Sequence, residues 1–193
     1  QREVVGGLSL LYTWQGADPK APPIMLMAHQ DVVPVAPGTE GDWEVPPFAG
    51  EVKDGFIWGR GSWDDKGNLL SQMEAVEMLL ASGYQPPRTI YLAYGADEEA
   101  GGARGAQQIA ALLQQRGVRL DFVLDEGLLV LEGLMPGIAK PTALIGGGAQ
   151  GVGHAGPFIQ AAAQGHQRHC HDECGARAHG GQTVAGRHPG RGV

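Results

Sequence analysis

The sequence predicts an α/β protein, a three-layer sandwich in which helices cover both faces of a largely parallel sheet. Three observations support this class. Short runs rich in β-branched and aromatic residues alternate with longer segments whose apolar residues recur at helical spacing. Strands that alternate with helices in this way usually pair in parallel. Finally, 42% of the 193 residues are hydrophobic, which is enough for one core.

Six apolar runs have the composition of β-strands. A proline-rich turn, residues 18–23, separates the first two. Asp54-Gly55 separates the third and fourth, and this pair suits the type I′ turn of a hairpin. The predicted strands are residues 8–14, 24–28, 51–53, 56–58, 89–94 and 122–124.

Two segments have the periodicity of amphipathic helices. In each, apolar residues recur every three or four positions, and a glycine follows that can end the helix. The stripes and their glycines are Leu69, Met73, Val76 and Leu80 with Gly83, and Ala106, Ile109 and Leu113 with Gly117.

The bulk properties exclude several classes of partner. The formal charge of −7 argues against nucleic acid, because phosphate binding needs a basic surface. No apolar run approaches the ~20 residues that span a bilayer, so we expect no membrane partner. The chain begins at Gln1 without a signal-peptide pattern, and we expect its natural N-terminus to lie upstream, which leaves the compartment open. Two late cysteines predict no disulfide framework.

The composition changes near residue 146. Residues 1–145 hold 19 of the 21 acidic residues and every lysine, whereas residues 146–193 hold six of the seven histidines and no leucine. Such a segment cannot bury enough apolar surface to offset its ordering entropy. We therefore expect one folded domain over residues 1–145 and an irregular or disordered tail over residues 146–193. GC-rich DNA read out of frame has this composition, so a frameshifted end is our hypothesis for the tail.

Acidic or imidazole side chains follow four of the predicted strands. In MLMAHQDVVPV, residues 25–35, His29 and Asp31 are two positions apart and would project to the same side of a strand end. Sites in open α/β sheets form at the carboxyl ends of strands, where such groups would repel one another unless cations lay between them. The other three clusters are Asp64-Asp65, Asp97-Glu98-Glu99 and Asp125-Glu126.

Each cluster also has a purely structural interpretation. A carboxylate pair after a strand can cap a helix, form a solvated turn or lie in an ordinary loop, and a His–Asp pair can simply cap the strand. The Gly-Arg-Gly run at 59–61 lacks the spacing of a phosphate loop. The coincidence of four clusters favours a metal site. One imidazole with several carboxylates suits zinc better than calcium or magnesium.

Five motifs resemble those of a known family. In chain order they are MLMAHQDVVPV, WEVPPFAG, IWGRGSWDDKG, ADEEAGG and FVLDEG, spread between about residues 8 and 145. The chain is similar to the dizinc exopeptidases and aminoacylases, and among them to the carboxypeptidase S branch, which includes N-acyl amino acid hydrolases. The resemblance implies a zinc-exopeptidase-like fold, of which this chain would carry the N-terminal part of the catalytic domain.

The resemblance also implies a role for each matching residue. Two zinc ions would be bound, with Co²⁺ or Mn²⁺ as substitutes, and the peptide bond after the bridging aspartate is often cis in the family. The metal ligands would be His29, Asp64 as the bridge, Glu99 and Asp125, with Glu126 as a less favoured substitute for Asp125. The catalytic residues would be Asp31, which orients and polarises His29, and Glu98, the general base and acid. Asp65 and Lys66 would be supporting residues.

The implied activity is hydrolysis of an amide bond that releases an amino acid from a peptide C-terminus or from an N-acyl amino acid. Full-length members of the family can form homodimers. The family's lid domain and its last histidine ligand have no clear counterpart here. His154 matches the lid motif only at the wrong spacing, and we interpret the His-Cys tract at 169–174 as incidental. We expect weak metal binding and little activity from this chain alone; the alternative is a non-catalytic metal-binding or interaction fragment.

Overall fold

The computed structural model describes residues 1–126, 130–133, 137–138, 140–143 and 184–185. The predictions made for His154, for the tract at 169–174 and for most of the tail lie outside these residues. None of the described helices combines the length and apolar character needed to cross a lipid bilayer.

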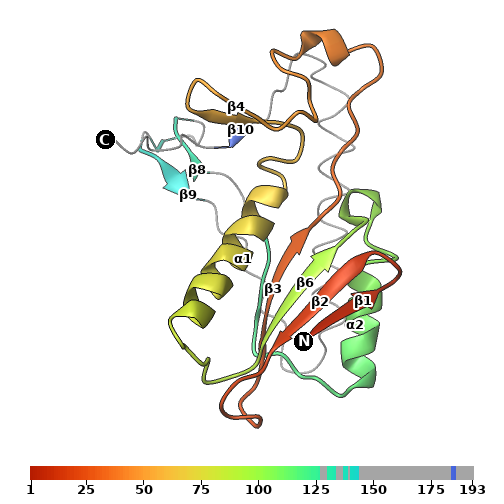
Figure 1. Ribbon diagram of the computed structural model, residues 1–193, viewed down its shortest axis with the longest axis vertical. Helices are drawn as coiled ribbons and strands as arrows, with labels where there is room; N and C mark the ends of the chain where they lie inside the picture. Colours follow the sequence, from red (N-terminus) through yellow and green to blue (C-terminus); the bar gives the residue numbers. More distant parts are fainter. Residues whose placement is uncertain (127–129, 134–136, 139, 144–183, 186–193) are drawn as a thin grey trace.

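The central sheet has five strands in the order β1-β2-β6-β3-β7 (Figure 1). β3 pairs in parallel with both β6 and β7, whereas β1 and β2 are added antiparallel on the other side of β6. The half of the sheet that ends at the acidic clusters is therefore parallel, as predicted. The strands are β1 (Arg2–Val5), β2 (Ser9–Trp14), β3 (Ile24–His29), β6 (Ile90–Gly95) and β7 (Val123–Leu124).

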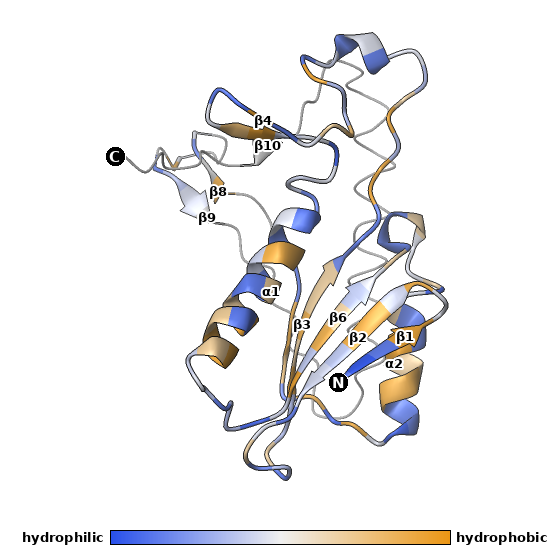
Figure 2. Ribbon diagram, in the orientation of Figure 1, coloured by the Kyte–Doolittle hydropathy of each residue, from blue (hydrophilic) through white to orange (hydrophobic). Residues whose placement is uncertain are grey.

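One helix covers each face of this sheet, which confirms the three-layer architecture. α1 (Lys66–Ala81) and α2 (Ala106–Gln115) lie on opposite sides of β3 and β6 (Figure 1). Because side chains alternate along a strand, β3 contributes to both cores. Figure 2 shows the apolar residues concentrated on the strands and on the helices that cover them. The α2 core contains Leu11, Met25, Met27, Ala93, Ile109 and Leu113, and the α1 core contains Ala28, Leu92 and Tyr94 with Leu69, Met73 and Val76.

Both helices end at the predicted glycines. Gly83 and Gly117 adopt positive φ angles of 75° and 67°, which a glycine reaches without steric cost. The residue after each glycine donates its amide to a carbonyl five positions back, so the last turn of each helix is closed. The predicted stripe of α1 is wrong at its end, because Leu80 is 55% exposed. Figure 1 shows the reason: the C-terminal end of α1 leans away from the sheet.

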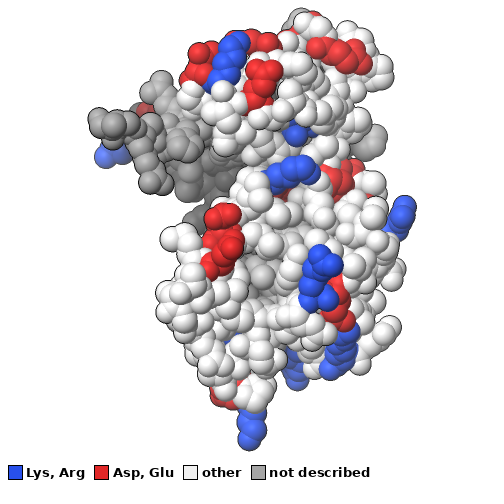
Figure 3. Space-filling model, viewed as in Figure 1, with Lys and Arg blue, Asp and Glu red and all other residues white. Residues whose placement is uncertain are grey.

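The predicted hairpin forms, but outside the central sheet. β4 (Glu51–Lys53) and β5 (Phe56–Trp58) pair antiparallel around Asp54 and Gly55, both with positive φ. β10 (Val184–Ala185), from the segment expected to be irregular, pairs with β5. Acidic side chains gather at the top of Figure 3, where this hairpin lies, whereas Lys and Arg are scattered over that face.

The remaining described elements are short. β1 was not predicted from the sequence; it pairs with β2 across Gly6 and Gly7. The others are the 3₁₀ turns η1 (Glu40–Asp42) and η2 (Glu98–Ala100) and the two-stranded ladder of β8 (Val130–Leu131) with β9 (Thr142–Ala143).

Ile109→Ala is expected to lower the free energy of unfolding by about 2–5 kcal/mol, because it leaves a cavity between α2 and the sheet. Ile109 is 1% exposed. The matched control, Leu80→Ala on the exposed end of α1, should change it by no more than about 0.5 kcal/mol. Urea unfolding followed by circular dichroism measures both. Similar losses in the two variants would contradict the assignment of the core.

Candidate metal centre

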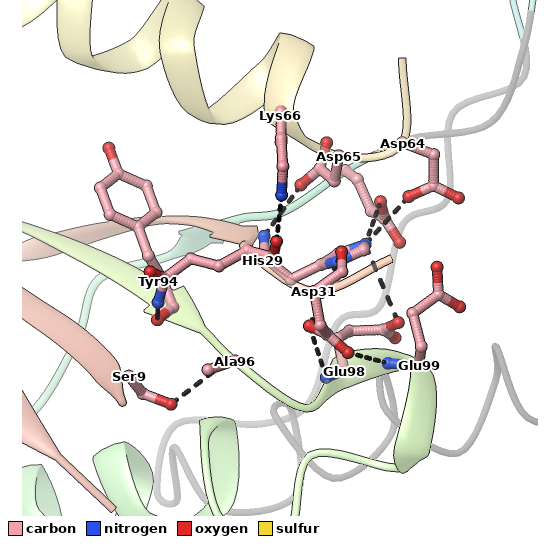
Figure 4. Close-up of polar contacts among 12 residues, drawn as sticks. Ser9, His29, Asp31, Asp64, Asp65, Lys66, Tyr94, Ala96, Glu98 and Glu99 are labelled. Carbon is pink, nitrogen blue, oxygen red and sulfur yellow. Dashed lines mark hydrogen bonds and ion pairs between the residues drawn. The ribbon is translucent and has the colours of Figure 1, made fainter. Parts of the chain in front are cut away.

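Four segments meet at the carboxyl ends of the parallel strands (Figure 4). His29 is the last residue of β3, η2 follows β6, and Asp125 follows β7. These three arrive at one sheet edge, as predicted. Asp64 and Asp65 do not follow a strand of this sheet; they reach the site from the loop between β5 and α1. The peptide bond that joins them is cis, as the family resemblance implied.

The His29 imidazole lies at the centre of the site and is almost fully buried, with 2% of the residue exposed. Its Nε2 atom is 2.9 Å from Asp64 Oδ1, 3.6 Å from Glu126 Oε2 and 3.9 Å from Glu98 Oε2. Carboxylates from three different segments therefore surround one ring nitrogen. Its other nitrogen, Nδ1, is 3.0 Å from the backbone carbonyl oxygen of Asp31.

The backbone of His29 and Gln30 is hydrogen-bonded on one side to Asp65 and Lys66 and on the other side to β6. The His29 amide donates to Asp65 Oδ2 at 3.1 Å, and the Gln30 amide donates to the Gly95 carbonyl at 2.7 Å. The Lys66 ammonium donates to the Gln30 carbonyl (Figure 4). Asp65 and Lys66 thus contact the chain that presents the imidazole, in line with the supporting role expected for them.

Asp31 contacts the turn that carries the two glutamates. Its Oδ1 atom accepts a hydrogen bond from the Glu98 amide and its Oδ2 atom from the Glu99 amide, each at 3.0 Å. The same carboxylate is 3.5 Å from His29 Nδ1. Asp31 therefore touches both the imidazole and the η2 turn, whereas the sequence indicated only the first of these contacts.

The crowding of carboxylates changes the pKa of several groups. Burial alone would lower the pKa of His29, but its contacts with Asp31, Asp64 and Glu126 outweigh burial and raise that pKa above its ordinary value. Burial would raise the pKa of Asp31, but hydrogen bonds from His29 and the two glutamate amides lower it. Burial, only partly offset by the His29 amide, raises the pKa of Asp65 to about 7.

Two groups of three residues have the composition and spacing of a metal site. In each group, one candidate ligand atom per residue lies within 4.8 Å of the others. Both groups contain His29, the single histidine among the described residues. The groups are His29, Asp64 and Glu99, and His29, Asp65 and Glu126.

These groups include three of the four ligands named from the sequence. Asp125 belongs to neither group; its Oδ1 atom accepts the Glu126 amide at 2.9 Å. Glu126, the less favoured substitute, is the residue of that pair whose carboxylate approaches His29. Successive residues of an extended chain point to opposite sides, and β7 has only two residues, so sequence reasoning could not decide which of the pair faces the site.

The donor set fits a divalent cation. One neutral imidazole nitrogen and several carboxylate oxygens are typical ligands of zinc and similar ions. Asp64 and Glu99 form one group with the imidazole, and Asp65 and Glu126 form the other. Asp31 and Asp65 accept backbone amides, from the η2 turn and from His29 respectively. These amides stabilise the two carboxylates, and, against burial, contacts with carboxylates raise the pKa of His29.

Comparison with protein families decides the assignment. The profile of the peptidase family M20/M25/M40 matches residues 25–184. The chain belongs to this family. Its members include metal-dependent carboxypeptidases, so the resemblance in the five sequence motifs is confirmed.

The M20 relatives include proteins that act on amides. N-fatty-acyl-amino acid synthase/hydrolase PM20D1 of Mus musculus is 52% identical over 145 residues, which are 75% of this chain and 28% of the relative. Carboxypeptidase S of Saccharomyces cerevisiae is 47% identical over 134 residues, which are 67% of this chain and 23% of the relative. The chain thus spans about a quarter of the length of these curated relatives.

Solved M20 structures share the fold. Human carnosine dipeptidase 1 superposes with a TM-score of 0.51 at 26% identity, over 63% of this chain and 26% of that protein. The metallo-carboxypeptidase Sso-CP2 of Sulfolobus solfataricus has a TM-score of 0.53 at 24% identity, over 66% of this chain and 28% of that protein, and supports the α/β fold alone.

Proposed function

We propose that this chain provides the metal-binding part of an amide hydrolase that releases an amino acid from a peptide C-terminus or from an N-acyl amino acid. One observation carries the proposal: a buried imidazole is within 4 Å of carboxylates from three segments, at the strand ends where the family motifs lie. The names of the relatives support both substrate classes, since one is an N-fatty-acyl-amino acid hydrolase and another is a carboxypeptidase.

The proposed site holds two zinc ions, with Co²⁺ or Mn²⁺ as substitutes. His29 would hold one ion, Glu99 would hold the other, and Asp64 would contribute its carboxylate to both. The grouping of His29, Asp64 and Glu99 supports this set. Asp125 was named as the remaining ligand, and the distance of 3.6 Å between Glu126 Oε2 and His29 Nε2 makes Glu126 its competitor.

Each side chain has a distinct chemical task in this proposal. When bound, the ions lower the pKa of a water molecule and polarise the substrate carbonyl. Glu98 would take a proton from the water molecule whose oxygen bonds to the carbonyl carbon, and would deliver it to the leaving amine as the C–N bond breaks. Its position beside the ligands supports this task, because Glu98 Oε2 is 3.9 Å from His29 Nε2. Asp31 orients His29 from the opposite ring nitrogen.

The metal part of the proposal is tested by zinc titration at several pH values. The raised pKa favours the protonated ring of His29 in the metal-free protein, and a metal needs the neutral ring. Zinc binding should therefore release about one proton from His29, and the affinity should increase with pH. Calorimetry in buffers of different ionisation enthalpy measures the release. His29→Ala should abolish it and His154→Ala should not; the reverse result would move the site to the tail.

The hydrolytic part is tested with N-acyl amino acids and C-terminal peptides. The 193-residue chain alone should bind zinc weakly and turn over little. A chimera in which residues 1–145 replace the aligned segment of the mouse relative should hydrolyse one of these substrates. Zinc binding without turnover in the chimera would favour the second candidate function, a non-catalytic metal-binding protein.

A further inference from the structure

The η2 turn begins without a cap from its own sequence. The first amides of a helical turn have no partner within the turn and need an acceptor from elsewhere. Asp97 stands at the capping position but makes no side-chain capping bond; its Oδ2 atom accepts the Arg104 amide at 2.7 Å instead. The amides of Glu98 and Glu99 are thus left for another acceptor.

The Asp31 carboxylate fills this place from a different strand. Its two oxygens accept the Glu98 and Glu99 amides separately, each at 3.0 Å (Figure 4). The register of the sheet makes this possible, because His29 is paired with Gly95 in the parallel β3–β6 ladder. Asp31 and η2 both lie just beyond that last pair. Bonds from amides to a charged carboxylate are stronger than bonds between neutral groups.

The position of the His29 imidazole depends less on the Asp31 carboxylate than the η2 turn does. His29 Nδ1 is 3.0 Å from the Asp31 backbone carbonyl and 3.5 Å from its Oδ1 atom. The carbonyl remains whatever side chain stands at position 31. The His29 amide is held by Asp65. The ring therefore has other supports, whereas the described contacts of the two glutamate amides are with Asp31.

We propose that Asp31 is a positioning residue whose carboxylate fixes the η2 turn against the end of β3, so that Glu98 and Glu99 are presented to His29 in one arrangement. This role couples the segment that carries the imidazole to the segment that carries the proposed base and a proposed ligand. Its value for catalysis rests on the proposed function, but the coupling itself is a property of the folded chain and is measured without substrate.

The test is amide hydrogen exchange resolved by NMR in the 193-residue chain. Asp31→Asn keeps the backbone carbonyl and the side-chain shape, but its amide has one acceptor oxygen and an NH₂ group that faces the other N–H. Exchange at Glu98, Glu99 or both should rise by about tenfold or more, as expected for loss of a bond to a charged acceptor. Exchange at the His29 amide should stay near wild type, because Asp65 still accepts it.

Asp121→Asn is the matched control. Asp121 makes an exposed ion pair with Arg88, so the variant removes the same charge away from the site. This variant should leave the exchange rates of the Glu98 and Glu99 amides unchanged. The positioning role is overturned if the exchange rates of both amides in Asp31→Asn stay within about twofold of wild type, because loss of a bond to a charged acceptor would change them far more.

A second measurement needs no variant and decides the question if Asp31→Asn does not fold. Scalar couplings across hydrogen bonds should join the amide nitrogens of Glu98 and Glu99 to the carboxyl carbon of Asp31 in the wild-type chain. Their absence would overturn the proposal. Absence of turnover in the chimera would contradict the proposed function while leaving both of these measurements as they are.

Discussion

Glu98→Gln is expected to lower the turnover number of a hydrolase built on this site by about 100- to 10,000-fold, the usual effect of removing a general base. The zinc content should stay nearly unchanged. Glutamine has the shape of glutamate but cannot take up and release the proton. Glu98 is in neither of the two groups with ligand spacing among the described residues, which is why its loss should spare the metal.

The measurement uses the chimera with the mouse relative, with turnover from initial rates and zinc from elemental analysis. Glu77→Gln on the exposed surface of α1 is the control for loss of one charge, and it should keep both turnover and zinc. An equal loss of metal and activity in Glu98→Gln would show that Glu98 is a ligand.

Asp64→Ala is expected to weaken zinc binding by more than about 100-fold, since even residues that only support ligands cost 10- to 100-fold. Both ions of the proposed site should be affected, because the bridging carboxylate proposed for Asp64 would serve both of them. Asp64 also makes the shortest contact to His29 Nε2, at 2.9 Å. Calorimetry with the 193-residue chain and metal analysis of the chimera give the affinity and the stoichiometry.

Asp121→Ala, far from the site, is the control for this series and should bind zinc like the wild-type chain. Two tightly bound zinc ions in Asp64→Ala would rule out the bridging role. Loss of one ion only would reassign Asp64 to a single metal.

The sequence predicted the fold well where side-chain periodicity determines burial. The bounds of β2, β3, β6 and β7 are within one residue of prediction, because these strands lie in or beside the core. β1 was missed because it is a short edge strand whose sequence, Arg-Glu-Val-Val, does not alternate between polar and apolar residues, although their burial does. Leu80 was misplaced because periodicity gives the direction of a side chain and not the distance of the helix end from the sheet.

The sequence predicted which strand ends carry the residues of the site, but it did not predict all the contacts that their side chains make there. Clusters after β3, β6 and β7 had to meet because parallel strands end at one edge. The approach of Asp64 to His29, 35 residues away, depends on the path of the loop between β5 and α1, which no local pattern encodes. The bonds between Asp31 and the η2 amides likewise depend on the register between β3 and β6. They could not be predicted from the sequence, because nearly every residue has a backbone amide and the amides leave no pattern in it.

The proposed ligands are dispersed along the chain, so metal affinity would report on the tertiary order of the protein. His29, Asp64 and Glu99 come from three segments that meet only in the folded state. An unfolded chain must close two long loops to offer the same three atoms, so zinc bound at the proposed site would favour the native ensemble. At a zinc concentration 100 times the dissociation constant, this selectivity adds about 2.7 kcal/mol to the free energy of unfolding. A loosely packed variant would then lose its zinc before it loses its secondary structure.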